Sequence, residues 1–189
     1  MKSSLFTLVL LLVSFTANAQ SQVSVFATLT PAGSFVGVSN QLKGEVVKKG
    51  DEISSAKLTV AVDTFKTEND LRDEHFRKHL NTGASPEATL TNFKGKDGKA
   101  TGDLEVNGVK KPVEITYAEK DGVIDAKINV KASDFNPTKV KYLGIGVKDE
   151  VRVEVKAKLV AAAAATAATA ATAQPTPASK ATPAKTKKK

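Results

Sequence analysis

Cysteine and tryptophan are absent from this chain of 189 residues, histidine occurs twice, and aromatic residues make up 5%. Without cysteine the chain has no disulfide, no thiolate nucleophile, no iron–sulfur cluster and no Cys-based zinc site. The two histidines, His75 and His79, leave little room for His-based catalysis. Serine–histidine–aspartate order, a glycine-rich phosphate loop and metalloprotease spacing are also missing from the sequence. We therefore expect a protein that is not an enzyme and that needs no cofactor.

The net charge of +8 is unevenly distributed along the chain. Residues 20–160 hold 22 basic and 20 acidic side chains, whereas residues 161–189 hold five lysines and no acidic residue. The middle of the chain is thus nearly neutral, and it lacks the basic and aromatic interleaving typical of nucleic-acid binding. Nucleic acid is not an expected partner.

The N-terminal residues 1–19 have the pattern of a cleaved secretory signal peptide. Lys2 precedes the apolar run 5–13, and the small residues Ala17 and Ala19 flank Asn18 before the expected cleavage. The apolar run is shorter than the roughly 20 residues of a spanning helix, although a retained N-terminal anchor is the alternative. We expect an exported, soluble protein that begins near Gln20.

The C-terminal residues 161–189 are rich in alanine, threonine, proline and lysine. Such a segment cannot bury enough surface to offset its chain entropy, so we expect a disordered tail. Two interpretations of its role remain open. Lys185 and Lys187–Lys189 could make weak contacts with anionic envelope surfaces, or the tail could solvate the chain without any partner.

Between these ends, residues 20–160 alternate between apolar and polar side chains in short runs. The clearest run is 151–159, where valine, alanine and leucine alternate with arginine, glutamate and lysine. This period of two is typical of antiparallel strands with one dry and one wet face. Turn sequences separate the runs, among them Asp97-Gly98, Asn107-Gly108 and Asp121-Gly122. The pattern predicts an all-β sandwich or an up-and-down barrel.

Residues 68–80 interrupt this alternation and predict one short helix, capped near Thr67 or Asn69 and ended before Gly83. At about 100° per residue the helix has two dissimilar halves. The half opposite the barrel carries Asp70, Asp73, Glu74, Arg77 and Lys78. The half expected to face the barrel carries Leu71, Arg72, His75, Phe76, His79 and Leu80.

Four segments resemble motifs of the YceI-like family of lipid- and polyisoprenoid-binding periplasmic proteins. Residues 71–76 are similar to its Arg-Asp-x-His-apolar helix, and residues 102–113 to its Gly-x-Leu hairpin with Lys-Pro-Val. Residues 132–135 resemble its Arg-x-Asp-Phe-Gly segment, and residues 147–151 its Val-Gly-Asp-Val entry to the last strand. The four motifs occur in the family's order and span roughly residues 22–160.

This resemblance implies an antiparallel, lipocalin-like β-barrel of about eight strands with a helix near its mouth. It also implies a periplasmic protein whose tunnel holds a long isoprenoid, such as a quinone or a prenyl alcohol, for transport or storage. The sequence departs from the family at residues 81–86, which replace Phe-Asp and Tyr-Pro after the helix. It departs again at Lys131, Ala132 and Asn136, near the expected mouth.

A long apolar ligand would gain about 0.8 kcal/mol for each methylene removed from water. Composition alone does not distinguish a tunnel from a filled core, so an envelope scaffold with a filled barrel, tethered by its basic tail, is the alternative function. The inward-facing positions that we expect to line a tunnel are Leu58, Val60, Val62, Leu104, Val106, Val113, Ile115, Ile124, Ile128, Val151 and Val153.

Arg72, His75 and His79 are the candidate polar ligand-binding residues at the mouth. They could hold a quinone carbonyl or a phosphate, or they could bind loop carbonyls and carboxylates of the protein itself. The histidines have the i, i+4 spacing of metal ligands, but Arg72 shares their arc and would repel a cation. No metal site is expected.

Overall fold

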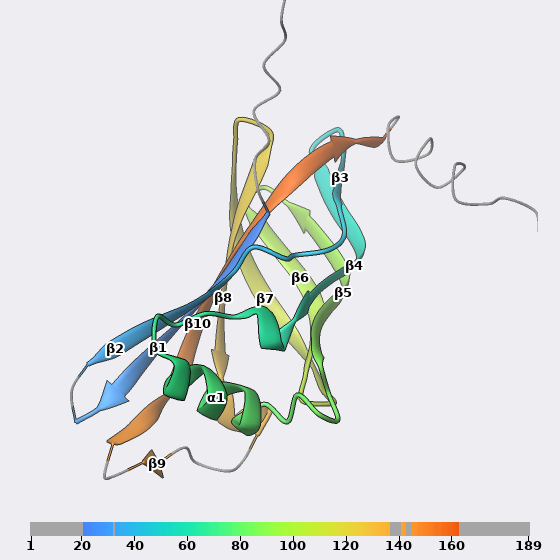
Figure 1. Cartoon of the computed structure of the whole chain (residues 1–189). Helices are drawn as coiled ribbons and strands as arrows, with labels where there is room; N and C mark the ends of the chain where they lie inside the picture. Colours follow the sequence, from blue (N-terminus) through green and yellow to red (C-terminus); the bar gives the residue numbers. More distant parts are fainter. Residues whose placement is uncertain (1–20, 32, 137–140, 143–144, 163–189) are drawn as a thin grey trace, which may run out of the picture.

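The computed structural model describes residues 21–31, 33–136, 141–142 and 145–162 (Figure 1). The predicted signal peptide, residues 1–19, and the predicted tail beyond residue 162 lie outside the described residues. The described chain is almost entirely β-structure with one α-helix, α1 (Asp70–His79), and the 3-10 turns η1 (Val62–Thr64) and η2 (Ala132–Asp134). The strands are β1 (Gln22–Thr30), β2 (Ser34–Ser39), β3 (Val46–Lys49), β4 (Glu52–Ala61), β5 (Glu87–Lys96), β6 (Lys99–Val106), β7 (Val109–Lys120), β8 (Val123–Lys131), β9 (Lys141–Tyr142) and β10 (Ile145–Ala161).

Within the described part of the chain, seven strands close a ring in the order β10-β3-β4-β5-β6-β7-β8 and back to β10. The ring is antiparallel from β3 to β8 and between β8 and β10. It is closed by a short parallel pairing, in which Leu159 of β10 lies opposite Val46 of β3. The predicted all-β, lipocalin-like barrel is confirmed.

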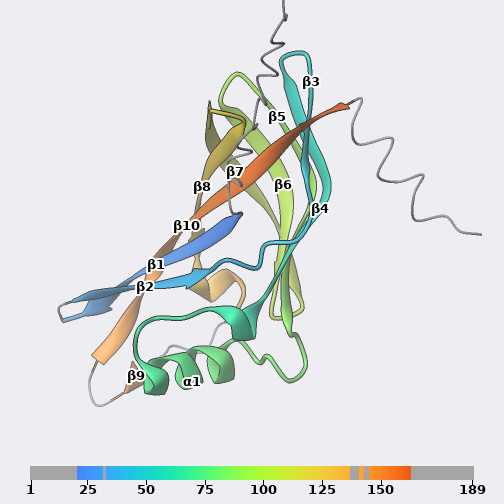
Figure 2. The same ribbon diagram turned by 45° about the horizontal axis from the view of Figure 1, so that its top comes forward.

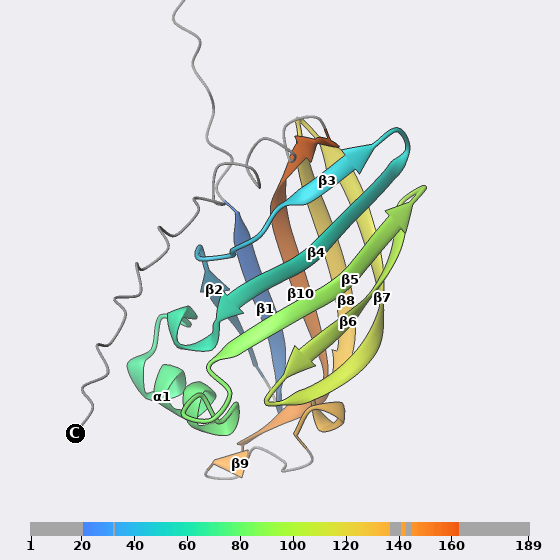
Figure 3. The same cartoon turned by 90° about the vertical axis from the view of Figure 1, so that its right-hand side faces the viewer.

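The 17-residue strand β10 is long enough to belong to the ring and to a side sheet. Residues Gly146–Lys156 of β10 pair with β1, which pairs in turn with β2. These strands extend away from the ring toward the end of the barrel where α1 lies (Figures 1 and 2). The turn between β3 and β4 lies at the opposite end (Figure 3). The two ends of the barrel therefore differ, and the α1 end is the mouth.

Three of the predicted turns are two-residue hairpin loops, at 97–98, 107–108 and 121–122. Both residues of each loop have positive φ, for example 54° at Asn107 and 73° at Gly108. This backbone matches the right-handed twist of the flanking strands, and Asn-Gly and Asp-Gly adopt it readily. The turn prediction is confirmed, and it fixes the register of β5 to β8.

The packed hydrophobic core lies at the end of the barrel that carries the turns at 50–51, 97–98 and 121–122, which we call the turn end. Ile53, Ala100 and Ile124 are each within two residues of a hairpin loop, and all three are buried. Phe93 and Ile115 belong to the same cluster, each 2% exposed. The strands are thus held together at one end by close packing and leave the other end to α1.

Candidate ligand-binding cavity

An internal cavity of about 890 Å³ lies between the barrel wall and α1. Its wall is the inward side of β1, β4, β5, β6, β8 and β10, where period two places apolar side chains. On β1, for example, Val23, Val25, Ala27 and Leu29 line the cavity. The cavity is therefore an apolar chamber with a few polar groups beside the helix.

Eight of the eleven predicted tunnel residues line this cavity. They come from four strands and η1, so the structure brings together side chains that are far apart in sequence. Their contact with a ligand stays a prediction. The eight are Leu58, Val60, Val62, Leu104, Val106, Ile128, Val151 and Val153.

The other three predicted residues, Val113, Ile115 and Ile124, do not line the cavity. Ile115 and Ile124 face inward as expected, but they lie at the turn end of the barrel, where close packing fills the interior. Val113 is half-buried on β7, where it packs against this cluster and borders a groove on the outside of the barrel. Period two identified the correct face of β8 but not the depth at which the chamber ends.

Helix α1 covers the mouth, and the helix prediction is confirmed. The Asn69 side chain caps it by accepting a hydrogen bond from the Arg72 amide at 2.9 Å. Phe76 packs against Phe65 of the barrel, with ring centroids 5.7 Å apart. All six residues of the predicted barrel-facing half line the cavity: Leu71, Arg72, His75, Phe76, His79 and Leu80.

The Arg72 side chain reaches the cavity but is bound to the protein. Its Nε donates to Thr67 Oγ1 at 2.9 Å, and its Nη2 donates to the Thr67 carbonyl. Its guanidinium also lies over the Phe35 ring, 4.9 Å from the centroid. These contacts fit the structural interpretation of Arg72, in which the guanidinium ties the start of α1 to β2.

Asp73 is a residue whose role the sequence did not reveal. It was assigned to the half of the helix opposite the barrel, yet it is 2% exposed. Its Oδ1 accepts hydrogen bonds from the Thr67 amide at 2.9 Å and the Thr67 hydroxyl at 2.6 Å. Burial acts to raise the pKa of Asp73, but these hydrogen bonds and the nearby Lys66 charge together lower it. We call Lys66, Thr67, Arg72 and Asp73 the helix anchor.

The two histidines lie one turn apart on α1 beside the cavity. Burial lowers the pKa of His79, because the uncharged imidazole is favoured where water is excluded. The Asn136 side chain donates to the His79 carbonyl at 2.8 Å and links the end of α1 to the segment after η2. Within the described ranges, no three His, Asp or Glu side chains come together as a metal site.

A second polar contact lies beside the mouth at η2. Asp149 of β10 accepts hydrogen bonds from the Ser133 amide at 2.7 Å and the Ser133 hydroxyl at 2.8 Å. Both residues line the cavity. The sequence pointed to 132–135 and 147–151 as separate motifs, and the structure shows that the two segments are hydrogen-bonded to each other.

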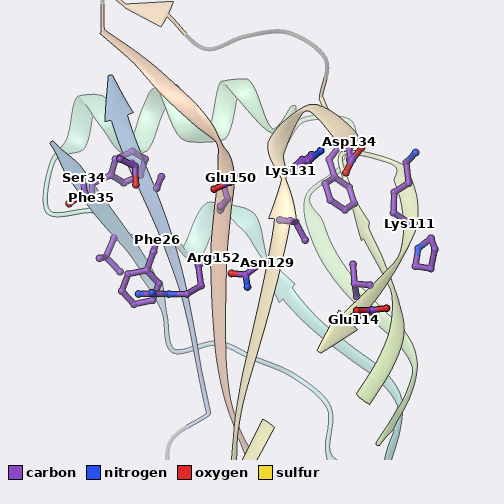
Figure 4. Close-up of a pocket in the computed structure, with 18 residues that line it drawn as sticks. Phe26, Ser34, Phe35, Lys111, Glu114, Asn129, Lys131, Asp134, Glu150 and Arg152 are labelled. Carbon is purple, nitrogen blue, oxygen red and sulfur yellow. The ribbon is translucent and has the colours of Figure 1, made fainter. Parts of the chain in front are cut away.

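A groove of about 970 Å³ lies on the outer side of β1, β2, β7, β8 and β10 (Figure 4). It carries charges of both signs, and the Arg152 guanidinium lies over the Phe26 ring at 4.4 Å. Phe35 and Phe135 border both this groove and the cavity, so they belong to the wall that separates the two. The groove therefore mixes charged and apolar side chains, whereas the cavity wall is mainly apolar.

Fold and site together define a lipocalin-like β-barrel with an internal apolar cavity. The sequence profile of the YceI-like domain matches residues 15–159, and the chain belongs to that family. Among related sequences, protein YceI of Escherichia coli O6:H1 is 36% identical over 102 residues. That match covers 46% of this chain and 52% of the relative, so the chain spans about half the length of the curated relatives it matches.

Solved structures share the fold at low sequence identity. BcnA of Burkholderia cenocepacia is 20% identical with a TM-score of 0.59, over 73% of this chain and 95% of that one. A polyisoprenoid binding domain from Saccharophagus degradans is 15% identical with a TM-score of 0.52, over 72% and 91% of the two chains. Among the described helices, none has the length and apolar character needed to cross a membrane.

Proposed function

We propose that this protein binds one long apolar lipid in the barrel cavity, and that the lipid is an isoprenoid such as a quinone or a prenyl alcohol. The observation that carries the proposal is the cavity of about 890 Å³ with its apolar wall. Each methylene moved from water into such a wall contributes about 0.8 kcal/mol before entropic costs. A chamber of this kind favours ligand binding over the alternative of a scaffold with a filled barrel.

The isoprenoid class is supported by membership of the YceI-like family and by the likeness to a polyisoprenoid binding domain. We propose that the ligand is held without chemical conversion. The apolar wall supports this, as do the internal hydrogen bonds of Arg72 to Thr67 and of Asp149 to Ser133. These side chains hold the start of α1 and η2 in place within the protein rather than acting on a ligand.

The setting that we propose is the periplasm, reached through a signal peptide over residues 1–19. Residues 20–160 then form the barrel domain, and residues 161–189 a lysine-rich tail. The tail would make weak contacts with anionic envelope surfaces. Transport and storage are both consistent with a barrel that takes up and releases one lipid.

A cavity-filling substitution tests the proposal against a matched control. Val60→Phe places a ring in the cavity, whereas Val36→Phe adds the same ring on β2, where Val36 is 38% exposed and borders the outer groove. Transfer of a radiolabelled prenyl alcohol from phosphatidylcholine vesicles to each variant is then measured. We expect Val60→Phe to lower binding by about tenfold or more and Val36→Phe to leave it unchanged. Equal binding by both folded variants would contradict a ligand site inside the barrel.

A further inference from the structure

The interior of the barrel is divided into a packed half and a hollow half. Phe93, Ile115 and Ile124 fill the turn end, and none of these three side chains lines the cavity. The hollow half begins at the mouth beneath α1. The chamber is therefore closed at one end by the hydrophobic core itself.

Three buried residues belong to both halves: Leu58 of β4, Leu90 of β5 and Ile128 of β8. Leu58 and Leu90 are direct partners across the β4–β5 pairing, and Ile128 pairs with Ile115 of the packed half. They are 5%, 8% and 2% exposed, so their positions are fixed by packing. We call Leu58, Leu90 and Ile128 the cavity floor.

A glycine on the neighbouring strand makes room for this floor. A Cβ at Gly102 would lie 2.9 Å from Leu90 Cδ1 and 3.2 Å from the Thr91 carbonyl oxygen. Since carbon atoms do not approach this closely, any larger residue at 102 would displace the Leu90 side chain. The glycine of the Gly-x-Leu segment thus leaves room for the Leu90 side chain.

We propose that the cavity floor sets the length of the chain that the barrel encloses. The proposal rests on the proposed function, because it concerns the lipid held in the same cavity. A methylene occupies about the volume of a water molecule, roughly 30 Å³, so the cavity of about 890 Å³ holds about thirty carbons. Isoprenoids of up to about six units are enclosed, and longer ones extend through the mouth.

The length limit has a sharp signature when the ligand comes from a membrane. A carbon that moves from lipid into the apolar cavity changes its surroundings little, so chains that fit are taken up almost equally. A carbon left in water outside the mouth costs about fourfold in affinity. Uptake should therefore stay level up to about thirty carbons and then fall by about a hundredfold or more for each added isoprene unit.

The test is a competition among prenyl alcohols of about three to ten isoprene units, mixed in the same phosphatidylcholine vesicles, with the bound species identified by native mass spectrometry. Leu58→Ala with Leu90→Ala removes six side-chain carbons from the floor, about 180 Å³, and should move the limit upward by about one isoprene unit. Val36→Ala shortens an apolar side chain that borders the outer groove and not the cavity, where Val36 is 38% exposed, and should leave the limit where it is. The single variant Leu90→Ala is measured in parallel, because the double variant loses more core packing.

Two results would overturn the proposal: uptake that continues without a break to the longest chains, or a break that stays at the same length in a folded floor variant. A parallel series of unbranched alkyl alcohols separates this proposal from the proposed function. If alkyl chains show the break and prenyl chains do not bind, the floor stands and the isoprenoid ligand is wrong. If neither series binds, both proposals are wrong.

Discussion

The helix anchor allows a quantitative prediction, because a buried carboxylate holds the segment that covers the cavity. Asp73→Ala removes the acceptor of two hydrogen bonds from Thr67, itself 3% exposed. Hydrogen bonds to a charged group contribute about 1.5–3 kcal/mol each, and a donor left buried without a partner costs about 1–3 kcal/mol. Since both bonds end on one oxygen and share its desolvation, we expect a loss of about 3 kcal/mol in the free energy of unfolding.

Urea denaturation of a set of variants measures this loss. Thr67→Val removes the hydroxyl but keeps the amide donor, and should cost about 1–2 kcal/mol. Glu74→Ala, at an exposed position next to Asp73 on α1, is the matched control and should change stability by less than about 0.5 kcal/mol. A double-mutant cycle between Asp73 and Thr67 should give a coupling of about 1–3 kcal/mol. A coupling near zero would refute the argument.

The pH dependence gives an independent check on Asp73. The folded-state pKa of Asp73 lies below that of the unfolded chain, so its stabilisation is present above about pH 4. It is lost as the pH falls through the folded-state pKa, because protonation then weakens the bonds from Thr67. The stability difference between the wild type and the non-titrating variant Asp73→Asn should therefore shrink below about pH 4. A difference that grows with acidification would contradict this account.

Three further predictions concern other parts of the fold. Burial lowers the pKa of His79 in the folded protein, so the unfolded chain takes up the proton first as the pH drops through about 6.5, and the free energy of unfolding falls. In His79→Gln, the free energy of unfolding measured in urea should therefore depend less on pH between about pH 7.5 and 5.5. Gly44→Ala should lower the free energy of unfolding in urea by about 3 kcal/mol or more, because its Cβ would lie 2.3 Å from the Lys57 carbonyl oxygen. The control Gly50→Ala also has positive φ but meets open space, and should lower it by about 1 kcal/mol. Equal losses in the two variants would show that the clash at Gly44 is relieved. Phe65→Ala should cost about 3–5 kcal/mol by the same assay, since Phe65 is 4% exposed, and a cost below about 1 kcal/mol would contradict its place in the core.

The sequence predicted the parts of the fold that local chemistry decides. Asn107-Gly108 and its two counterparts specify hairpin loops because these residues tolerate positive φ. The Asn69 cap and the spacing of the apolar residues specify α1 and the half of it that faces the barrel. In each case the conformation is determined by the chemistry of a few neighbouring residues.

What the sequence could not predict depends on contacts between distant segments. Ile124 and Ile128 share one face of β8, yet Ile124 lies in the packed core and Ile128 also borders the cavity. Alternation fixes a face and says nothing of depth. Asp73 is buried because Lys66 is hydrogen-bonded to Val38 of β2, which brings the segment before α1 back over the helix. No local pattern encodes that pairing, or the parallel closure of β3 on β10.

The central claim, that the barrel holds a long apolar lipid, is tested most directly by native mass spectrometry of protein purified from the periplasm without detergent. Organic extraction of the same sample then identifies any bound molecule. The account predicts a discrete added mass with a prenyl or acyl fragmentation pattern, lost in the Val60→Phe variant and kept in Val36→Phe. A bare polypeptide mass that stays unchanged after incubation with quinones and prenyl alcohols would contradict it.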